Sequence, residues 1–373
     1  MLRKKLSILL AILLTVGLVF AVVGCSSDTG SDNTDKSATE DKGSSDSSKD
    51  SGSGEKLEMV FGHNDPVVSV GSDAAKLFAE LVKEKSNGTM TIEVFPANQL
   101  GGNRDLTQQT IDGAIDFTMG GIGNLGDFMP EYNMMMAMFV FEDQSHIRSV
   151  VEGELGKRLA QKLLDEHGLR MISQTWDRAT RQIVSTKKIV EPADLKGIVI
   201  RAGYPGAEVP MRALGASPTQ IPLAEMYTAL SQNVIQAVEM PWSYIVGESL
   251  FEVADYVIRT DNTFGTRFFA MNEDLYQKMT PEQRQIIMEA VEEAGIYNNQ
   301  NTWAEIDEYK ELLQEKGMEF VTPNREGMID IVKGKIGELE ELWEIQGLYE
   351  EIHSDKYKSG DVDYKNTAPA VKW

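Results

Sequence analysis

Cysteine and histidine are scarce in this chain of 373 residues. The only cysteine is Cys25, so no disulfide can form within the chain and the fold has to be stabilised by its core. The four histidines, His63, His146, His167 and His353, are scattered and have no metal-site spacing. No Gly-x-Ser-x-Gly segment marks a hydrolase nucleophile. We therefore expect no metal, no other cofactor and no enzymatic activity.

Basic residues are also in short supply. The chain has 36 Lys and Arg against 58 Asp and Glu, a formal net charge of -22. This balance argues against nucleic acid as a partner and against binding of anionic lipid through a basic patch. A cationic pocket in such an acidic protein has to be built locally, so an arginine inside a cleft points to an anionic ligand.

Large apolar residues are absent from residues 26–55, which contain no Val, Ile, Leu or aromatic residue and a single alanine. Such a segment cannot bury enough apolar surface to offset the entropy lost on ordering. We predict a flexible tether over residues 25–55, followed from about Lys56 by a globular part long enough for two lobes.

The N-terminus has the pattern of an export signal. Arg3, Lys4 and Lys5 precede an uncharged run from Leu6 to Val23. The run is long enough for an uncleaved membrane anchor, but Val22-Val23-Gly24-Cys25 resembles the lipobox of bacterial lipoproteins. That resemblance implies a signal peptide over residues 1–24, a diacylated Cys25, and attachment to the outer face of the cytoplasmic membrane. A chance cysteine beside a signal peptide is the alternative.

The globular part begins with strands and helices in alternation. The periodicity predicts strands near 57–61, 90–94, 114–119 and 171–176, with helices after Ser72 and over 100–112 and 149–167. A second series has strands at 182–185, 198–200, 234–238 and 256–258, with helices near 207–214 and 223–231. This order predicts an α/β fold of two lobes, the first with a largely parallel sheet.

A long helix is predicted to connect the lobes. Thr280-Pro281-Glu282-Gln283 has the sequence of a capping box, and helical spacing continues to about Glu315. Its length, on the order of 50 Å, exceeds the width of one lobe, which suggests a hinged cleft. We assign 56–178 and about 260–300 to lobe I, and 179–259 and about 301–350 to lobe II. A helix is expected over 328–343, and 351–373 is expected to be a peripheral tail.

Seven segments between Val60 and Gly295 resemble the substrate-binding proteins of TRAP (tripartite ATP-independent periplasmic) transporters. Their order and spacing carry the resemblance, which implies a two-lobed protein that closes on an organic anion and delivers it to a membrane permease. The segments are Leu77-Phe-Ala-Glu-Leu-Val-Lys-Glu-Lys-Ser-Asn-Gly88, Asn98-Gln-Leu-Gly101, Gly113-Ala-Ile-Asp-Phe117, Pro192-Ala-Asp-Leu-Lys-Gly-Ile-Val-Ile-Arg201, Leu214-Gly-Ala-Ser-Pro-Thr219, Glu225-Met-Tyr-Thr-Ala-Leu230 and Glu239-Met-Pro241.

The resemblance also implies ligand-binding residues. Arg201 matches the arginine that holds the ligand carboxylate, and Arg181 matches a second, assisting arginine. Asn233 and Asn64 match frequent ligand contacts. Two further candidates are Glu239 and Trp176, the latter as a stacking wall or a core residue. The chain departs from the family pattern at Gly120-Gly121, Leu223 and Met240, so the resemblance leaves the acid unnamed.

The physical case for Arg201 is independent of the resemblance. Ligands of open α/β sheets bind outside the carboxyl ends of the strands, and Arg201 ends the apolar strand Ile198-Val199-Ile200. A guanidinium matches a carboxylate with two parallel hydrogen bonds and stays charged at neutral pH. A solvated strand end is the alternative interpretation.

Two other functions stay open at this point. Gly121-Ile-Gly-Asn-Leu-Gly126 is a formal G-x-G-x-x-G after a predicted strand, which would suggest an NAD-dependent oxidoreductase. Pro130 leaves little room for the helix that this motif needs. The lobes could also form a ligand-sensing ectodomain of a membrane receptor, since sensing and uptake use the same closed form.

Overall fold

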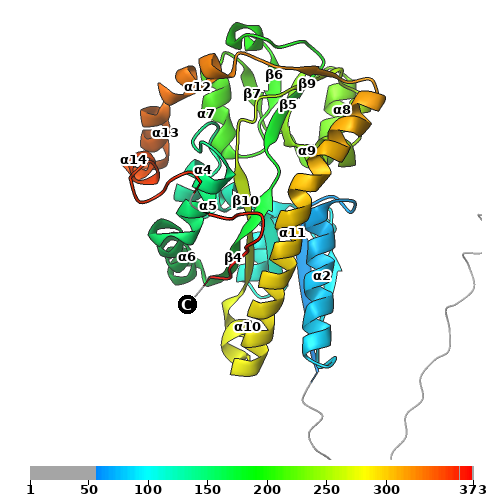
Figure 1. The fold of residues 1–373 in the computed structure, drawn as a ribbon, viewed down its shortest axis with the longest axis vertical. Helices are drawn as coiled ribbons and strands as arrows, with labels where there is room; N and C mark the ends of the chain where they lie inside the picture. Colours follow the sequence, from blue (N-terminus) through cyan, green and yellow to red (C-terminus); the bar gives the residue numbers. More distant parts are fainter. Residues whose placement is uncertain (1–55, 361, 372–373) are drawn as a thin grey trace, which may run out of the picture. The chain divides into compact units, whose positions relative to one another are not determined.

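The computed structural model describes residues 56–360 and 362–371. The predicted signal peptide, Cys25 and the tether lie outside the described residues. Within the described part, no helix combines the length and the apolar character that crossing a bilayer requires. Two sheets, each with its own helices, form the two predicted lobes (Figure 1).

Lobe I is built on a five-stranded sheet in the order β2-β1-β3-β10-β4. β1 pairs in parallel with β2 and β3, whereas β10 runs antiparallel to β3 and β4. The strands are β1 (Leu57–His63), β2 (Met90–Phe95), β3 (Phe117–Gly121), β4 (Leu169–Arg178) and β10 (Gly265–Asn272).

Lobe II is built on a six-stranded sheet in the order β11-β9-β5-β8-β6-β7. β6 is parallel to β7 and β8, whereas β5 is antiparallel to β8 and β9. The strands are β5 (Arg181–Ser185), β6 (Val199–Arg201), β7 (Ser217–Thr219), β8 (Ala237–Pro241), β9 (Tyr256–Ile258) and β11 (Glu319–Val321). Each sheet therefore has one antiparallel strand among otherwise parallel strands, β10 in lobe I and β5 in lobe II, and the largely parallel sheet predicted for lobe I is confirmed.

Helix α2 (Val70–Lys85) shows how the helices are held in place. The hydroxyl of Ser69 caps it by accepting from the backbone N–H of Ser72 at 3.2 Å. Its apolar face buries Ala74, Phe78 and Val82 in the core of lobe I. The aromatic packing centres on Phe78, whose ring meets the ring of Phe269 on β10 edge to face at 4.8 Å.

Helix α11 (Pro281–Glu315) confirms the predicted long helix. The Thr280 hydroxyl accepts from the N–H of Gln283, and the Gln283 side chain accepts from the N–H of Thr280. Its first half buries Ile287 and Val291 in the core of lobe I, and its second half buries Leu313 in the core of lobe II. Figure 1 shows α11 beside α2 at one end and running to the second lobe at the other.

Two further connections cross between the lobes. Only Ala179 and Thr180 separate β4 from β5, and residues 259–264 separate β9 from β10. Buried amide side chains of α11 hydrogen-bond to the backbone just before the first connection. The Asp177 N–H donates to Oδ1 of Asn299 at 2.6 Å, and Nδ2 of Asn298 donates to the Asp177 carbonyl at 2.9 Å. These two short strand-to-strand segments and α11 thus connect the lobes.

The remaining helices cover the two sheets. The expected helix over 149–167 is interrupted at Gly153, where a Cβ would collide with Tyr357. The other helices are α3 (Asn103–Ile111), α4 (Glu131–Met134), α5 (Gln144–Glu152), α6 (Glu154–His167), α7 (Pro205–Ala213), α8 (Met226–Ser231), α9 (Trp242–Gly247) and α10 (Glu273–Lys278).

The C-terminal part packs more closely than predicted. The expected helix over 328–343 is two helices, α12 (Arg325–Lys333) on lobe II and α13 (Ile336–Trp343), which packs with α14 (Leu348–Ile352) against α4 of lobe I. The final residues are not a peripheral tail. Ala370 bridges to Ser173 on β4, and Ala368 is buried in the core of lobe I.

Candidate functional site

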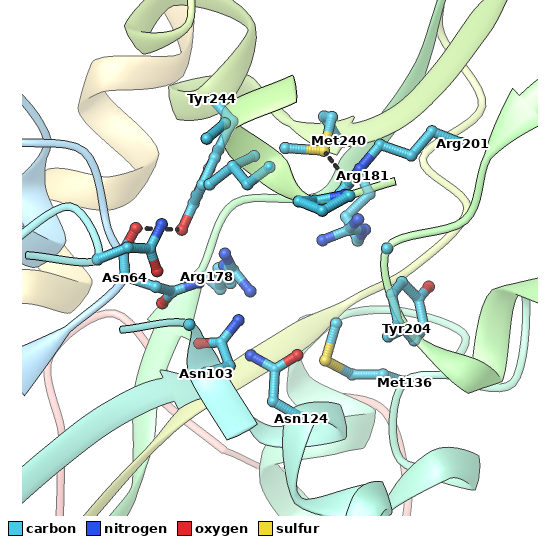
Figure 2. Close-up of a pocket in the computed structure, with 16 residues that line it drawn as sticks. Asn64, Asn103, Asn124, Met136, Arg178, Arg181, Arg201, Tyr204, Met240 and Tyr244 are labelled. Atoms are coloured by element: carbon cyan, nitrogen blue, oxygen red, sulfur yellow. Dashed lines mark hydrogen bonds between the residues drawn. The ribbon is translucent and has the colours of Figure 1, made fainter. Parts of the chain in front are cut away.

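A cavity of about 310 Å³ lies where the strands of both lobes end (Figure 2). Its wall is rich in arginine, asparagine and aromatic side chains, and no acidic residue of the described part lines it. Lobe I contributes Asn64, Asn103, Asn124, Met136 and Arg178, and lobe II contributes Arg181, Arg201, Tyr204, Met240 and Tyr244.

The mixed sheet of lobe II brings its arginines to one edge. Arg201 is the last residue of β6, and β8, which is parallel to β6, ends at Pro241. Because β5 is antiparallel to β8, its first residue, Arg181, pairs with Pro241. The start of β5 and the ends of β6 and β8 therefore meet at the cavity, as the strand-end rule predicts for Arg201.

Arg201 is a buried cation without a carboxylate partner among the described residues. Its side chain donates from Nε to the carbonyl of Ile221 at 2.9 Å and from Nη1 to the sulfur of Met240 at 3.3 Å. Burial, followed by the positive charge of Arg181, lowers the pKa of Arg201 to about 10. The guanidinium therefore stays charged at neutral pH. Its Nη1 donates to the sulfur of Met240, which is a much weaker acceptor than a carboxylate.

Arg181 lines the same cavity but already has a carboxylate partner. Its Nε donates to Oε1 of Glu239 at 2.6 Å, its Nη2 lies 2.6 Å from Oε2, and Nη2 also donates to the Glu239 carbonyl at 2.8 Å. Glu239 is fully buried and does not line the cavity. The structure thus places Glu239 behind Arg181, where it orients the guanidinium toward the cavity.

Arg178, at the end of β4, is a cavity residue that we did not predict. Its guanidinium lies 5.2 Å from the ring centre of Tyr244. The backbone leaves room for it, because a Cβ at Gly121 would overlap Nη1 of Arg178. A usable signal was present in the sequence, since Arg178 follows a predicted strand just as Arg201 does.

Asparagine amides line the lobe I side. Asn64 is buried, and its Oδ1 has no hydrogen-bond partner among the described residues. The backbone at Asn64 is tied across the cleft, because the hydroxyl of Tyr244 donates to its carbonyl at 3.1 Å. Asn103 and Asn124 approach from neighbouring segments (Figure 2). An amide offers both a donor and an acceptor, so this wall suits hydroxyl groups.

Buried charges support this wall from behind. Nε of Arg267 donates to Oδ2 of Asp65 at 2.6 Å. Burial alone would raise the pKa of Asp65, but Arg267 and Arg178 hold it well below its usual range. Burial lowers the pKa of His63 to about 4, so this ring is neutral and adds no positive charge.

The structure does not bring Trp176 or Asn233 to the cavity. Trp176 is a core residue whose Nε1 donates to the Val291 carbonyl of α11 at 3.0 Å. Asn233 is exposed, in the left-handed conformation, and its Oδ1 accepts from Gln236 at 3.2 Å. Asn233 precedes β8, so it lies at the opposite end of that strand from the cavity.

The glycine motif serves packing instead of phosphate binding. Residues Ile122–Asp127 form a short 3-10 helix, so the α-helix that would hold a pyrophosphate is not formed there. Cβ atoms would collide with Met136 at Gly123 and with Asn133 at Gly126, and Gly121 makes room for Arg178. The geometry thus removes the basis for the dinucleotide-binding alternative.

Comparison with known proteins also indicates a protein that binds a solute. Residues 61–338 match the family described as bacterial extracellular solute-binding protein, family 7. The 2,3-diketo-L-gulonate-binding periplasmic protein YiaO of Escherichia coli is 27% identical over 71% of this chain and 80% of its own. The sialic acid-binding periplasmic protein SiaP of Vibrio cholerae is 27% identical over 72% of this chain and 84% of its own.

A solved structure shows a matching fold. A TRAP periplasmic solute binding protein of Roseobacter denitrificans, determined with bound L-galactonate, superimposes with a TM-score of 0.74 at 26% identity. The match covers 80% of this chain and 99% of that one.

Proposed function

The chain belongs to family 7 of the bacterial extracellular solute-binding proteins, and on this premise we propose that Arg201 captures the carboxylate of an organic acid in the cleft. The lobes close on the acid, and the liganded protein delivers it to the membrane subunits of a TRAP transporter. The proposed role is transport without a catalysed reaction, because the relatives and the matching structure are solute-binding proteins.

The observation that carries the proposal is the state of Arg201. Arg201 is 7% exposed and lines the cavity, and its guanidinium has no carboxylate within ion-pair distance among the described residues. Burying such a charge costs free energy that a ligand carboxylate returns on binding. Two charge-assisted hydrogen bonds to that carboxylate would stabilise the complex by roughly 1.5 to 3 kcal/mol each.

Arg181 assists Arg201 in this proposal. Its orientation is set by Glu239 before the ligand arrives, so little conformational entropy is lost when it meets a carboxylate. Glu239 acts as a positioning residue and does not touch the ligand. Trp176 and Asn233 have no ligand contact in this proposal, because neither lines the cavity.

The asparagines suggest that the acid carries hydroxyl groups. Asn64, Asn103 and Asn124 present amides to the cavity, and the side-chain Oδ1 of Asn64 has no hydrogen-bond partner among the described residues. The acids named for the relatives, 2,3-diketo-L-gulonate and L-galactonate, are hydroxylated carboxylates. A hydroxylated acid held by lobe II at its carboxylate and by lobe I at its hydroxyls would favour the closed cleft.

A thermal-shift screen of organic acids on the purified protein tests the proposal. A ligand that binds only the folded state raises the melting temperature, and a concentration 100 times the Kd adds about 2.7 kcal/mol of stability. We expect the best responses from hydroxylated carboxylates. Uncharged sugars serve as the matched control, and a best response to one of them would contradict carboxylate capture.

We also propose that the exported protein is anchored through lipid on Cys25. The support is the N-terminal pattern alone, in which the apolar run from Leu6 ends at Gly24-Cys25. We expect the full-length protein to sediment with membranes after expression in its host, and Cys25→Ala to remove that lipid attachment. Mass spectrometry of the mature N-terminus decides the matter, since a first residue other than an acylated Cys25 would refute the anchor.

A further inference from the structure

We infer that the cleft contains a second anion site, built on Arg178, and that the transported acid is a hydroxylated dicarboxylate. The inference rests on the proposed function, because it takes Arg201 as the site of the first carboxylate. It goes further by giving the ligand a second carboxylate and by naming the residue that selects for it.

Arg178 is a buried cavity residue whose hydrogen-bonding capacity is not satisfied by the described residues. Its side chain is 6% exposed and lines the cavity, yet its Nε has no hydrogen-bond partner among the described residues. Burial lowers the pKa of Arg178, and its aromatic neighbour is the ring of Tyr244. A buried guanidinium without hydrogen bonds is costly, so the site is complete only when an acceptor occupies the cavity.

The nearest carboxylate does not satisfy Arg178. Asp65 lies with Oδ1 3.8 Å from Nη2 of Arg178, which is beyond hydrogen-bond distance. Its oxygens face other donors, because Oδ2 accepts from Arg267 at 2.6 Å and Oδ1 lies 3.0 Å from the Tyr244 hydroxyl, whose single proton is shared with the Asn64 carbonyl. Asp65 therefore forms only a long ion pair with Arg178 and no hydrogen bond to it.

The excess of arginines over carboxylates around the cavity favours a ligand with two negative charges. Two carboxylates, Asp65 and Glu239, face four arginines: the two that they bind, Arg267 and Arg181, and the two left without a carboxylate hydrogen bond, Arg178 and Arg201. His63 is neutral because burial holds its pKa near 4. Glu248 acts on Arg201 electrostatically but forms no ion pair with it among the described contacts. Among Asp65, Glu239 and these four arginines, positive charges exceed negative charges by two.

The two arginines without a carboxylate hydrogen bond belong to different lobes. Arg178 ends β4 of lobe I, whereas Arg201 ends β6 of lobe II, and Figure 2 shows both side chains directed into the cavity. A dicarboxylate held by one arginine at each end bridges the lobes. A monocarboxylate leaves one buried guanidinium without a partner, which lowers its affinity relative to that of the diacid.

The test uses acids that differ only at one terminal carbon. The pairs are gluconate with glucarate, galactonate with galactarate, and succinamate with succinate. Calorimetry on the purified protein is expected to find its tightest ligand among the diacids, at least tenfold tighter than the matched monoacid. 6-Phosphogluconate is compared with gluconate and glucarate, because a phosphate could also occupy an arginine site.

The Arg178→Gln variant assigns the effect to this residue. We expect the diacid to bind at least tenfold more weakly, while the affinity of the matched monoacid changes less than threefold. Arg212→Gln, at an exposed arginine of α7, is the control and should bind both acids as the parent does. An equal loss for both acids in Arg178→Gln would overturn the selective role of Arg178.

The parent protein alone can also overturn the inference, whatever the stability of the variant. A monoacid as the tightest ligand would refute the second anion site while leaving carboxylate capture intact. Tighter binding of 6-phosphogluconate than of any diacid would refute a second carboxylate. Binding of none of these acids, with an uncharged ligand found instead, would refute the proposed function itself.

Discussion

Arg201→Gln is expected to weaken binding of the organic acid by about 100-fold or more. The substitution removes two charge-assisted hydrogen bonds of roughly 1.5 to 3 kcal/mol each, and 1.4 kcal/mol corresponds to a tenfold change in Kd. Glutamine keeps much of the length of the side chain and one donor group, so the loss reports the charge and the planar fork. Isothermal titration with the best acid from the screen measures it.

The stability of the unliganded Arg201→Gln protein provides the critical control. Arg201 has no carboxylate to lose among the described residues, so removing its buried charge should leave the melting temperature unchanged or higher. Arg212→Gln should retain both binding and stability. Retained affinity in Arg201→Gln would refute the carboxylate clamp, and lost binding with a lowered melting temperature would indicate a structural role instead.

Glu239→Gln is expected to have the opposite profile, with a large loss of stability. Arg181 and Glu239 form a buried pair with side chains 6% and 0% exposed. Removing one partner of such a pair leaves an unpaired buried charge and typically costs 3–5 kcal/mol. We expect the free energy of unfolding from urea titration to fall by about that amount.

A surface pair supplies the matched comparison for Glu239→Gln. Glu319 pairs with Lys188 at 2.6 Å, and both side chains are 52% exposed. Glu319→Gln should cost only about 0 to 1 kcal/mol, because solvent screens exposed pairs. Equal losses in the two variants would show that the Arg181 charge is not isolated by burial. A saturating organic acid should restore part of the stability of Glu239→Gln, since it supplies a carboxylate next to Arg181.

Local sequence signals predicted the long helix and the principal arginine. The capping box at Thr280 and the uninterrupted helical spacing to Glu315 depend only on neighbours along the chain, and α11 has those bounds. Arg201 followed from the strand-end rule, which needs only the direction of one strand. These features were accessible because they depend on contacts within a few residues.

Features that depend on pairing across the chain were missed. β10 has apolar residues on both faces and pairs with β3 and β4, which are far away in sequence, so alternation did not reveal it. The role of Glu239 was also invisible, because its partner Arg181 lies 58 residues away on an antiparallel neighbour. Asn233 was expected at the ligand from the resemblance, but it precedes β8 and lies at the opposite end of that strand from the cavity.

The sequence by itself determined the class of molecule: a two-lobed α/β fold with a long bridging helix and an arginine at a strand end, because periodicity, capping and turn chemistry are local properties. Only the tertiary structure decided which charges are available to a ligand. The buried ion pair with Glu239 fixes the orientation of Arg181. Arg178 and Arg201 have no carboxylate hydrogen bond among the described residues. Such a distinction arises from distances between segments, which no local pattern encodes.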